Sequence, residues 1–502
     1  MKTLSKLILA TIITVFFSCE KDENTKDPID TTVNFQFKTT IKIGGEGASE
    51  ITAYDAVSKK LFTVNVELGN ISITNISNLN TPIQEASIDL SIYGVPNSVA
   101  IQDGKLAVAI EANPKQNPGK ILIFNTSNNT LLKQYTVGAL PDMVTFSKNG
   151  RLVLSANEGE PNDAYDNDPN GSVSIIDLTT DNVTTLDFTA FNSQETTLKS
   201  QGFRVFGPGA TLAQDVEPEY IAISDDSNTA WVSLQENNGL AKINLVSKTI
   251  EAIYPLGFKD YSLTGNEIDA SDRDDVKELK KWPVFGMYQP DAIKYVNISG
   301  TDYIFSANEG DARDYSGFSE EARVKDLTLD ETIFPAALNY KNDSNIGRLK
   351  TTTTLGDANN DNKYEAIYSY GARSFSVWSA TGSLLYDSGN SIATETLTAT
   401  SSIFNGGDDR SDDKGAEPES VEILNIGNER YILFVGLERN NQVLVYDVTN
   451  PLAPQFLSIL SHSGDEAPEG LLVIPAADSP NGKDLLVVSN EVSGTVTIYQ
   501  NN

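Results

Sequence analysis

Residues 140–178 read LPDMVTFSKNGRLVLSANEGEPNDAYDNDPNGSVSIIDL, and their pattern recurs along most of the chain. A proline–acid pair, Pro141–Asp142, opens an apolar run, and a second run, Leu152–Leu154, follows a Lys-Asn-Gly turn. A third run, Val173–Ile176, comes after an acidic loop. Short β-rich runs separated by Gly, Asn and Asp predict an antiparallel meander of strands, which is one blade of a propeller.

Copies of this pattern occur in most other parts of the chain. They are VPNSVAI (95–101), VEPEYIAIS (216–224), QPDAIKYV (289–296), EPESVEIL (417–424) and APEGLLVI (467–474). A first copy from Ser49 lacks the proline, and residues 363–382 lack the proline–acid pair but keep a hairpin pattern. Repeats of this kind predict one all-β domain, a β-propeller. The count gives eight blades, with seven blades as the alternative.

The composition excludes several classes of function. The 502 residues include 69 acidic and 37 basic side chains, and the formal net charge is −32. This charge argues against binding to nucleic acid, because phosphate contacts need a positive surface. The chain has one histidine, His462, and one cysteine, Cys19. Serine–histidine–aspartate catalysis and metal centres built on imidazole or thiolate are therefore disfavoured.

The N-terminus resembles a bacterial lipoprotein signal. Lys2 and Lys6 precede an apolar run, Leu7–Phe17, that is too short to span a bilayer, and Ser18–Cys19 follows it. We expect cleavage before Cys19 and lipidation of its thiol, which would anchor the protein to outer-membrane lipid. An incidental cysteine in a simple signal peptide is the alternative.

These signals divide the chain into three parts. Residues 1–18 form the predicted signal peptide, residues 19–32 a polar tether and residues 33–502 the propeller. Glu20–Glu23 is similar to the charged tag that sends some lipoproteins to the outer face of the outer membrane. The predicted location is therefore the cell envelope, with the propeller exposed at the surface.

Carboxylates stand at two recurring positions of the repeat. In an up-and-down blade, the start of the first strand and the end of the second lie at the same end of the sheet. The innermost strands of a propeller line its channel, so we expect these acids to form a binding surface at the channel mouth. The predicted pairs are Asp142 with Glu158, Glu219 with Glu236, Asp291 with Glu309, Glu419 with Glu438, and Glu469 with Glu491.

Like charges this close raise one another's pKa unless a cation or an arginine compensates them. Four arginines lie near the same strand ends: Arg313, Arg373, Arg410 and Arg439. They are the candidate catalytic residues if the site holds a phosphoryl group. The alternative is an ion-pair network between blades that only closes the ring.

The loop GDANNDNKYE, residues 356–365, predicts a calcium site. Oxygen-bearing side chains alternate along it and can wrap one hard cation together with a backbone carbonyl. The expected ligands are Asp357, Asn359, Asp361, the Lys363 carbonyl and Glu365. The loop departs from the EF-hand, and a solvated turn is the alternative. Two less regular acidic loops, 158–168 and 408–419, are expected on the top face of the propeller.

Several long motifs resemble the choice-of-anchor I family. They include PDMVTFSKNGRLVLSANEGEP, SANEGDARDY, GARSFSVW, RSDDKGAEPE and FVGLERNNQVLVYDVTNP, and the resemblance extends from about Phe35 to the C-terminus. The family is similar to mesenchyme-specific cell-surface glycoproteins and to atypical bacterial proteins labelled alkaline phosphatase. The resemblance implies an extracytoplasmic β-propeller on a variable anchor.

Two functions are compatible with these features. The first is a binding or adhesion module at the cell surface, stabilised by calcium, whose channel mouth takes an unidentified surface ligand. The second is a calcium-dependent phosphomonoesterase acting on a phosphorylated small molecule, in which cations and arginines hold the phosphoryl group. Five pairs of similar acids favour binding, because catalysis usually needs an asymmetric set of carboxylates.

Overall fold

The computed structural model of the chain describes residues 32–502. The predicted lipidation site, Cys19, and the predicted signal peptide lie outside the described residues. No helix within residues 32–502 is long and apolar enough to cross a membrane.

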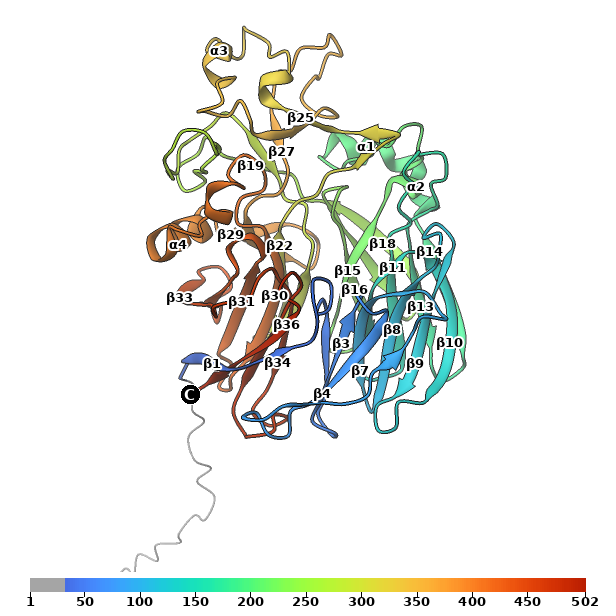
Figure 1. Cartoon of the computed structure of the whole chain (residues 1–502). Coiled ribbons are helices and arrows are strands. Elements are labelled where there is room, and N and C mark those ends of the chain that lie inside the picture. The colour runs from blue at the N-terminus through green and yellow to red at the C-terminus, as the bar shows by residue number, and fades with distance from the viewer. Residues whose placement is uncertain (1–31) are drawn as a thin grey trace, which may run out of the picture.

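Antiparallel sheets arranged as blades form a β-propeller (Figure 1). Blade 1 contains β2 (Thr52–Asp55), β3 (Lys60–Asn65) and β4 (Asn70–Asn75), with β5 (Ile83–Gln84) and β6 (Ile88–Asp89) both paired to β4. Blade 2 contains β7 (Val95–Gln102), β8 (Lys105–Glu111), β9 (Pro118–Asn125) and β10 (Leu131–Ala139). Blade 3 contains β11 (Pro141–Phe146), β12 (Leu152–Asn157), β13 (Ser172–Asp177) and β14 (Asn182–Asp187).

The remaining blades follow the same order. Blade 4 contains β15 (Pro218–Ile223), β16 (Thr229–Leu234), β17 (Gly239–Asn244) and β18 (Thr249–Pro255). Blade 5 contains β21 (Ile293–Ile298), β22 (Thr301–Asn308), β28 (Ser374–Ser379) and β29 (Leu384–Asp387). Blade 6 contains β30 (Pro418–Asn425), β31 (Tyr431–Leu437), β32 (Gln442–Asp447) and β33 (Gln455–Leu460).

The last blade joins the two ends of the described chain. Blade 7 contains β34 (Pro468–Ile474), β35 (Leu485–Asn490), β36 (Thr495–Asn501) and, as its fourth strand, β1 (Phe35–Lys42), which pairs antiparallel with β36. The first strands of successive blades contact one another in the order β2, β7, β11, β15, β21, β30 and β34, and β34 contacts β2. The ring is therefore closed, and its first strands are innermost.

The described chain forms seven blades, so the count of eight is wrong. Residues 363–382, taken from the sequence as a separate repeat, include β28, which pairs with β22 as the third strand of blade 5. Residues 309–373 are inserted between these two paired strands. The insertion divides blade 5. The second half of the blade, β28 and β29, therefore has the hairpin pattern without the opening proline–acid pair.

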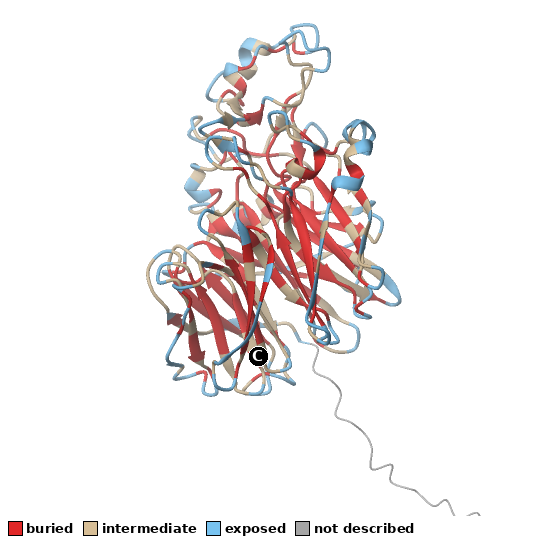
Figure 2. Ribbon diagram, turned by 90° about the vertical axis from the view of Figure 1, so that its right-hand side faces the viewer, coloured by how far each residue is buried: buried red, intermediate tan, exposed pale blue. Residues whose placement is uncertain are grey.

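Apolar side chains pack between neighbouring blades. Each of the seven blade interfaces of the described chain has a core cluster. Between blades 3 and 4, for example, Leu154 and Ile175 belong to the same cluster as Ile221 and Val232. Buried residues fill the strands, and exposed residues are concentrated in the connections (Figure 2). Burial of these apolar faces fixes the sheets relative to one another and so fixes the channel.

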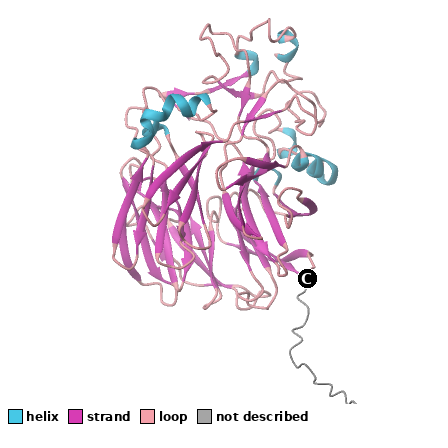
Figure 3. Ribbon diagram, turned by 180° about the vertical axis from the view of Figure 1, so that it is seen from behind, coloured by secondary structure: helices cyan, strands magenta, loops and turns pink. Residues whose placement is uncertain are grey.

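The long connections leave the propeller at the end where the second strands finish. They contain α1 (Glu195–Ser200), α2 (Leu212–Asp215), α3 (Ala337–Tyr340) and α4 (Ser391–Thr400), and the short strands β19 (Phe258–Asp260), β20 (Phe285–Met287), β23 (Asp314–Tyr315), β24 (Phe318–Ser319), β25 (Glu321–Arg323), β26 (Lys350–Thr352) and β27 (Tyr368–Ser369). The helices lie towards this end in the view from behind (Figure 3). A separate apolar cluster, which includes Ile268, Leu327 and Ile367, stabilises the inserted region.

Candidate functional site

A ring of acids surrounds the channel at one end of the propeller. The first strand of every blade starts there, and each blade places one polar side chain at or just before that start. The seven residues, in blade order, are Glu50, Asn97, Asp142, Glu219, Asp291, Glu419 and Glu469. They line a cavity of about 370 Å³, and no lysine or arginine of the described chain lines it with them. Six of the seven blades therefore direct a carboxylate at the same space.

A β-bulge at the start of the inner strands explains this placement. In five blades a proline precedes the polar residue and the strand register shifts there, as between Pro141 and Met143 in blade 3 and between Pro468 and Gly470 in blade 7. Proline has no N–H to donate, so it is tolerated at the first residue of a strand. The bulge redirects the side chain that follows it. The proline–acid pair of the repeat thus places its carboxylate in the channel wall.

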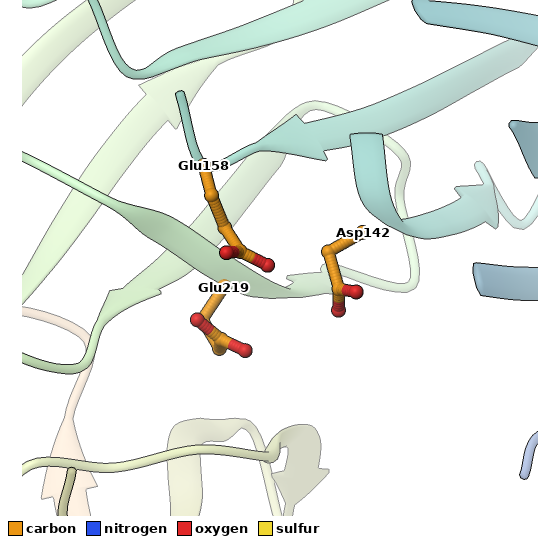
Figure 4. A group of neighbouring side chains, drawn as sticks. All are labelled: Asp142, Glu158 and Glu219. Carbon is orange, nitrogen blue, oxygen red and sulfur yellow. The ribbon is translucent and has the colours of Figure 1, made fainter. Parts of the chain in front are cut away.

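The acids at the ends of the second strands complete two clusters of similar construction. One oxygen from each of Asp142, Glu158 and Glu219 lies within 4.8 Å of the other two. We call these residues the blade 3–4 cluster (Figure 4). Asp291, Glu309 and Glu419 repeat the arrangement one pair of blades later, and we call them the blade 5–6 cluster.

Each cluster combines a predicted pair with the first acid of the next blade. The predicted pairs Asp142–Glu158 and Asp291–Glu309 are therefore brought together in the structure. The other three predicted pairs are not part of such a compact group, but in each the second acid raises the pKa of the first. These pairs are Glu219 with Glu236, Glu419 with Glu438, and Glu469 with Glu491.

Burial and mutual repulsion raise the pKa values of the channel carboxyl groups. Burial is the larger cause at Glu50, whose pKa rises to about 8, and at Asp142, whose pKa rises to about 6. The same two causes, burial first, hold the pKa well above its usual range at Glu158, Glu219, Asp291, Glu419 and Glu469. A bound cation would offset both the burial and the mutual repulsion of these groups, because it favours the charged form of every carboxyl group around it.

The two clusters differ in how their charge is compensated. In the blade 5–6 cluster, the Lys414 ammonium pairs with Glu309, and Gln235 donates a hydrogen bond to Glu309 Oε2 at 3.0 Å. The three carboxylates of the blade 3–4 cluster form no hydrogen bond or ion pair with any residue in 32–502. Lys115, whose charge lowers the pKa of Glu158, forms its ion pair with Glu160.

Glu417 is the centre of a third acidic group, with Glu309 and Glu438. Three cations surround its carboxylate. Arg410 Nη2 lies 2.6 Å from Oε1, and Arg439 Nε and Lys414 Nζ lie 3.2 and 3.5 Å from Oε2. Burial alone would raise the pKa of Glu417, but these cations hold it below its usual value. This group is an internally neutralised ion-pair network.

The sequence matches a protein family over most of its length. The family model of the choice-of-anchor I domain matches residues 50–451. The chain belongs to the choice-of-anchor I family. That match begins at Glu50, the acid that precedes the first blade, and covers the inner strands of blades 1 to 6.

This choice-of-anchor I domain is also similar to one curated relative and to two solved structures. Gigasin-3a of Magallana gigas is 30% identical over 188 residues, which are 32% of this chain and 66% of that protein. The WD40 repeats of RRP9 align with a TM-score of 0.50 at 9% identity, covering 93% of this chain and 100% of theirs, and support the propeller fold. A chain of Kuenenia stuttgartiensis hydrazine synthase aligns with a TM-score of 0.49 at 12% identity, covering 92% of this chain and 97% of its own.

The four predicted arginines of the choice-of-anchor I domain all have partners. The Arg313 side chain is 2% exposed, and its guanidinium lies 2.6 Å from Asp215 Oδ1 and 2.9 Å from Glu217 Oε1. Arg373 is buried and donates hydrogen bonds to three backbone carbonyls. Arg410 and Arg439 belong to the Glu417 network. A phosphoryl group would have to displace carboxylates or carbonyls to reach Arg313 or Arg373, whereas the side chains of Arg410 and Arg439 are 29% and 39% exposed.

The predicted calcium loop lies on the insertion of blade 5, outside the channel wall. One oxygen from each of Asp357, Asp361 and Glu365 lies within 4.8 Å of the other two. Asp357 accepts hydrogen bonds from the backbone N–H groups of residues 361 and 362 at 3.0 and 2.9 Å, and Asn359 Nδ2 donates to Glu365 Oε1 at 2.8 Å. The backbone N–H of Lys363 donates to Asp361 Oδ1 at 2.9 Å. The loop brings the predicted side chains together, and calcium binding by them stays a prediction.

Sequence reasoning missed several residues of the site. Glu50 was missed because blade 1 lacks the proline that marks the repeat. Glu217 and Glu417 each precede such a proline, in two Glu-Pro-Glu triplets, and this doubled acid is the signal that could have revealed them. Lys414 lies on a loop outside the repeat. Its position could not be predicted, because only the fold brings it to Glu309.

Proposed function

We propose that this choice-of-anchor I propeller is a binding module at the cell surface and that its acidic channel mouth takes a positively charged ligand. The observation that carries the proposal is the ring of six carboxylates around a cavity of about 370 Å³, whose described lining contains no lysine or arginine. Field lines from like charges are concentrated in a cleft with low-dielectric walls, so a cation is drawn into it.

The distribution of the acids favours binding over acid–base catalysis. Catalytic carboxyl groups usually work as a pair whose environments push the two pKa values apart. Here burial and like charge raise the pKa of all six carboxyl groups of the ring, from Glu50 through Asp291 to Glu469. Such a ring suits a ligand that contacts several blades at once, such as a peptide segment rich in lysine.

The binding test uses tetralysine and isothermal titration calorimetry. We expect wild-type protein to bind this probe and the variant Glu219→Gln with Glu469→Gln to bind it at least about tenfold more weakly, which is about 1.4 kcal/mol. Binding should weaken with salt, since the ligand and the ring are both charged. The control is Glu331→Gln, which removes the same charge from an exposed position on the insertion. Equal affinity for the wild type and the ring variant would contradict the proposal.

The proposal also includes calcium as a stabilising ion in the loop at residues 356–365. If calcium binds only the folded protein, a concentration of about 100 times its dissociation constant stabilises it by roughly 2.7 kcal/mol. A chelator should then lower the melting temperature of the wild type. The double variant Asp357→Ala with Asp361→Ala should melt at the same temperature with and without calcium. A wild-type melting temperature unaffected by chelator would remove this part of the proposal.

A place at the cell surface is supported by the family to which the chain belongs and by the sequence before residue 32. We propose that Cys19 carries the lipid anchor and that the outer membrane holds the protein.

Phosphomonoesterase activity is the alternative that the same preparation can test. We expect calcium-loaded protein to hydrolyse p-nitrophenyl phosphate no faster than a variant with Arg373→Ala and Arg410→Ala. Calcium-dependent turnover that disappears in this variant, with its circular dichroism spectrum unchanged, would replace the binding proposal with an enzymatic one.

A further inference from the structure

The blade 3–4 cluster is built from two blades and converges on one point. Asp142 lies at the bulge of β11, Glu158 follows β12, and Glu219 lies at the bulge of β15. The three side chains are neighbours whose carboxylates lie in the same space (Figure 4). One oxygen from each lies within 4.8 Å of the others. Ligand oxygens on opposite sides of a calcium ion are about 5 Å apart, because each calcium–oxygen bond is about 2.4 Å long.

Glu158 provides an independent indication that the cluster holds a ligand. Only 9% of its surface is exposed. Its carboxylate accepts no hydrogen bond and forms no ion pair within residues 32–502. A buried carboxylate without a partner is costly, and proteins usually supply one or bind a metal ion there.

The blade 5–6 cluster shows what the same architecture does when the chain supplies the cation itself. Asp291, Glu309 and Glu419 occupy the positions of Asp142, Glu158 and Glu219, two blades further along the ring. There the ammonium of Lys414 pairs with Glu309, the counterpart of Glu158. No lysine or arginine among the described residues forms an ion pair with Glu158.

We propose that the carboxylates of Asp142, Glu158 and Glu219 bind one hard divalent cation of the calcium type between blades 3 and 4. Three carboxylates offer six oxygen atoms, and calcium prefers oxygen ligands. The negative charges of the carboxylates also offset the charge of the ion. The site is separate from the loop at residues 356–365, and it shares Asp142 and Glu219 with the channel wall proposed to take the positively charged ligand. It gives blades 3 and 4 a shared ion where blades 5 and 6 share Lys414.

The test measures calcium binding to the full chain by isothermal titration calorimetry after chelator treatment. The background carries Asp357→Ala and Asp361→Ala, so that the loop cannot contribute. We expect one calcium ion per chain, and at least tenfold weaker binding when Glu158→Gln is added. Glu331→Gln, on the exposed part of the insertion, is the charge-matched control. Absence of calcium binding in the background protein, or an affinity unchanged by Glu158→Gln, would overturn the proposal.

A gain-of-site variant makes the test independent of any loss of folding. Lys414→Gln removes the internal cation of the blade 5–6 cluster, and we expect a second calcium ion to bind per chain. If Glu158→Gln does not fold, Glu219→Gln takes its place in the loss experiment. An unchanged stoichiometry in a folded Lys414→Gln variant would contradict the comparison of the two clusters. Tetralysine binding, measured on Glu158→Gln and Lys414→Gln, reports separately on the proposed function, because neither side chain lines the channel cavity.

Discussion

Replacing Glu50 with glutamine should make the stability of the protein less dependent on pH when no divalent cation is present. Burial, followed by repulsion from Glu491 and Asp142, raises the pKa of Glu50 from 4.5 to about 8. The folded protein therefore keeps a proton that the unfolded chain releases above pH 4.5. The free energy of unfolding must then fall as the pH rises from 4.5 towards 8, and below 4.5 this group has no effect.

The size of the loss in unfolding free energy follows from the difference between the two pKa values of Glu50. At about 1.36 kcal/mol per pH unit, the difference between 4.5 and about 8 sets a ceiling of roughly 5 kcal/mol. Glu50 is only partly buried and lines a cavity that water can enter. Water screens its charge, so we expect about 2 kcal/mol. Glutamine has the same shape and no charge, so Glu50→Gln should keep this contribution at high pH.

Urea unfolding in the presence of chelator, at about pH 5 and about pH 8, measures the difference. The wild type should lose about 2 kcal/mol more than Glu50→Gln between the two conditions, and the exposed control Glu331→Gln should behave like the wild type. Adding calcium should reduce the pH dependence of the wild type, because a bound cation stabilises ionised carboxylates. An equal loss of stability in wild type and Glu50→Gln would refute the reasoning.

Three further perturbations test other parts of the molecule. Cys19→Ala should move the protein from the detergent phase to the aqueous phase of a detergent partition, and equal partitioning of both forms would exclude the anchor. A chain that starts after Lys42 lacks β1, so it should melt at a lower temperature than one that starts at Thr32. Equal melting of the two would show that the fourth strand of blade 7 is dispensable. Arg313→Met should destabilise the fold by about 3–5 kcal/mol in urea unfolding, because it leaves two buried carboxylates without a cation; a loss below about 1 kcal/mol would argue against the buried network.

The sequence predicted the propeller because its repeat has a physical cause. In four of the five proline–acid pairs the proline is the first residue of an inner strand, and the bulge after it turns the acid into the channel, as at Pro141–Asp142. The copy at residues 363–382 was misleading because the third strand of a blade followed by its fourth has the same alternating pattern as a new repeat. Only pairing in space assigns β28 to β22, across the insertion of residues 309–373.

The candidate site was predictable to the extent that it depends on strand ends. Asp142 and Glu158 come together because antiparallel strands return to the same end of a sheet, and this can be read from spacing. The contact of Glu158 with Glu219 depends on the angle between neighbouring blades, which spacing does not contain. Arg313 was expected near the mouth, but its partners, Asp215 and Glu217, lie in and after α2, which no repeat pattern marks.

The pairing of β1 with β36 determines which end of the propeller lies opposite the two ends of the described chain. Lys42 lies opposite Thr495, close to the strand end that carries Glu491, whereas Phe35 lies opposite Asn501. Thr32 and the C-terminus therefore lie at the end of the propeller opposite the carboxylates, as Figure 1 also shows. If the protein is attached through one of these ends, to a membrane or to a sensor chip, its acidic channel mouth faces the surrounding solution.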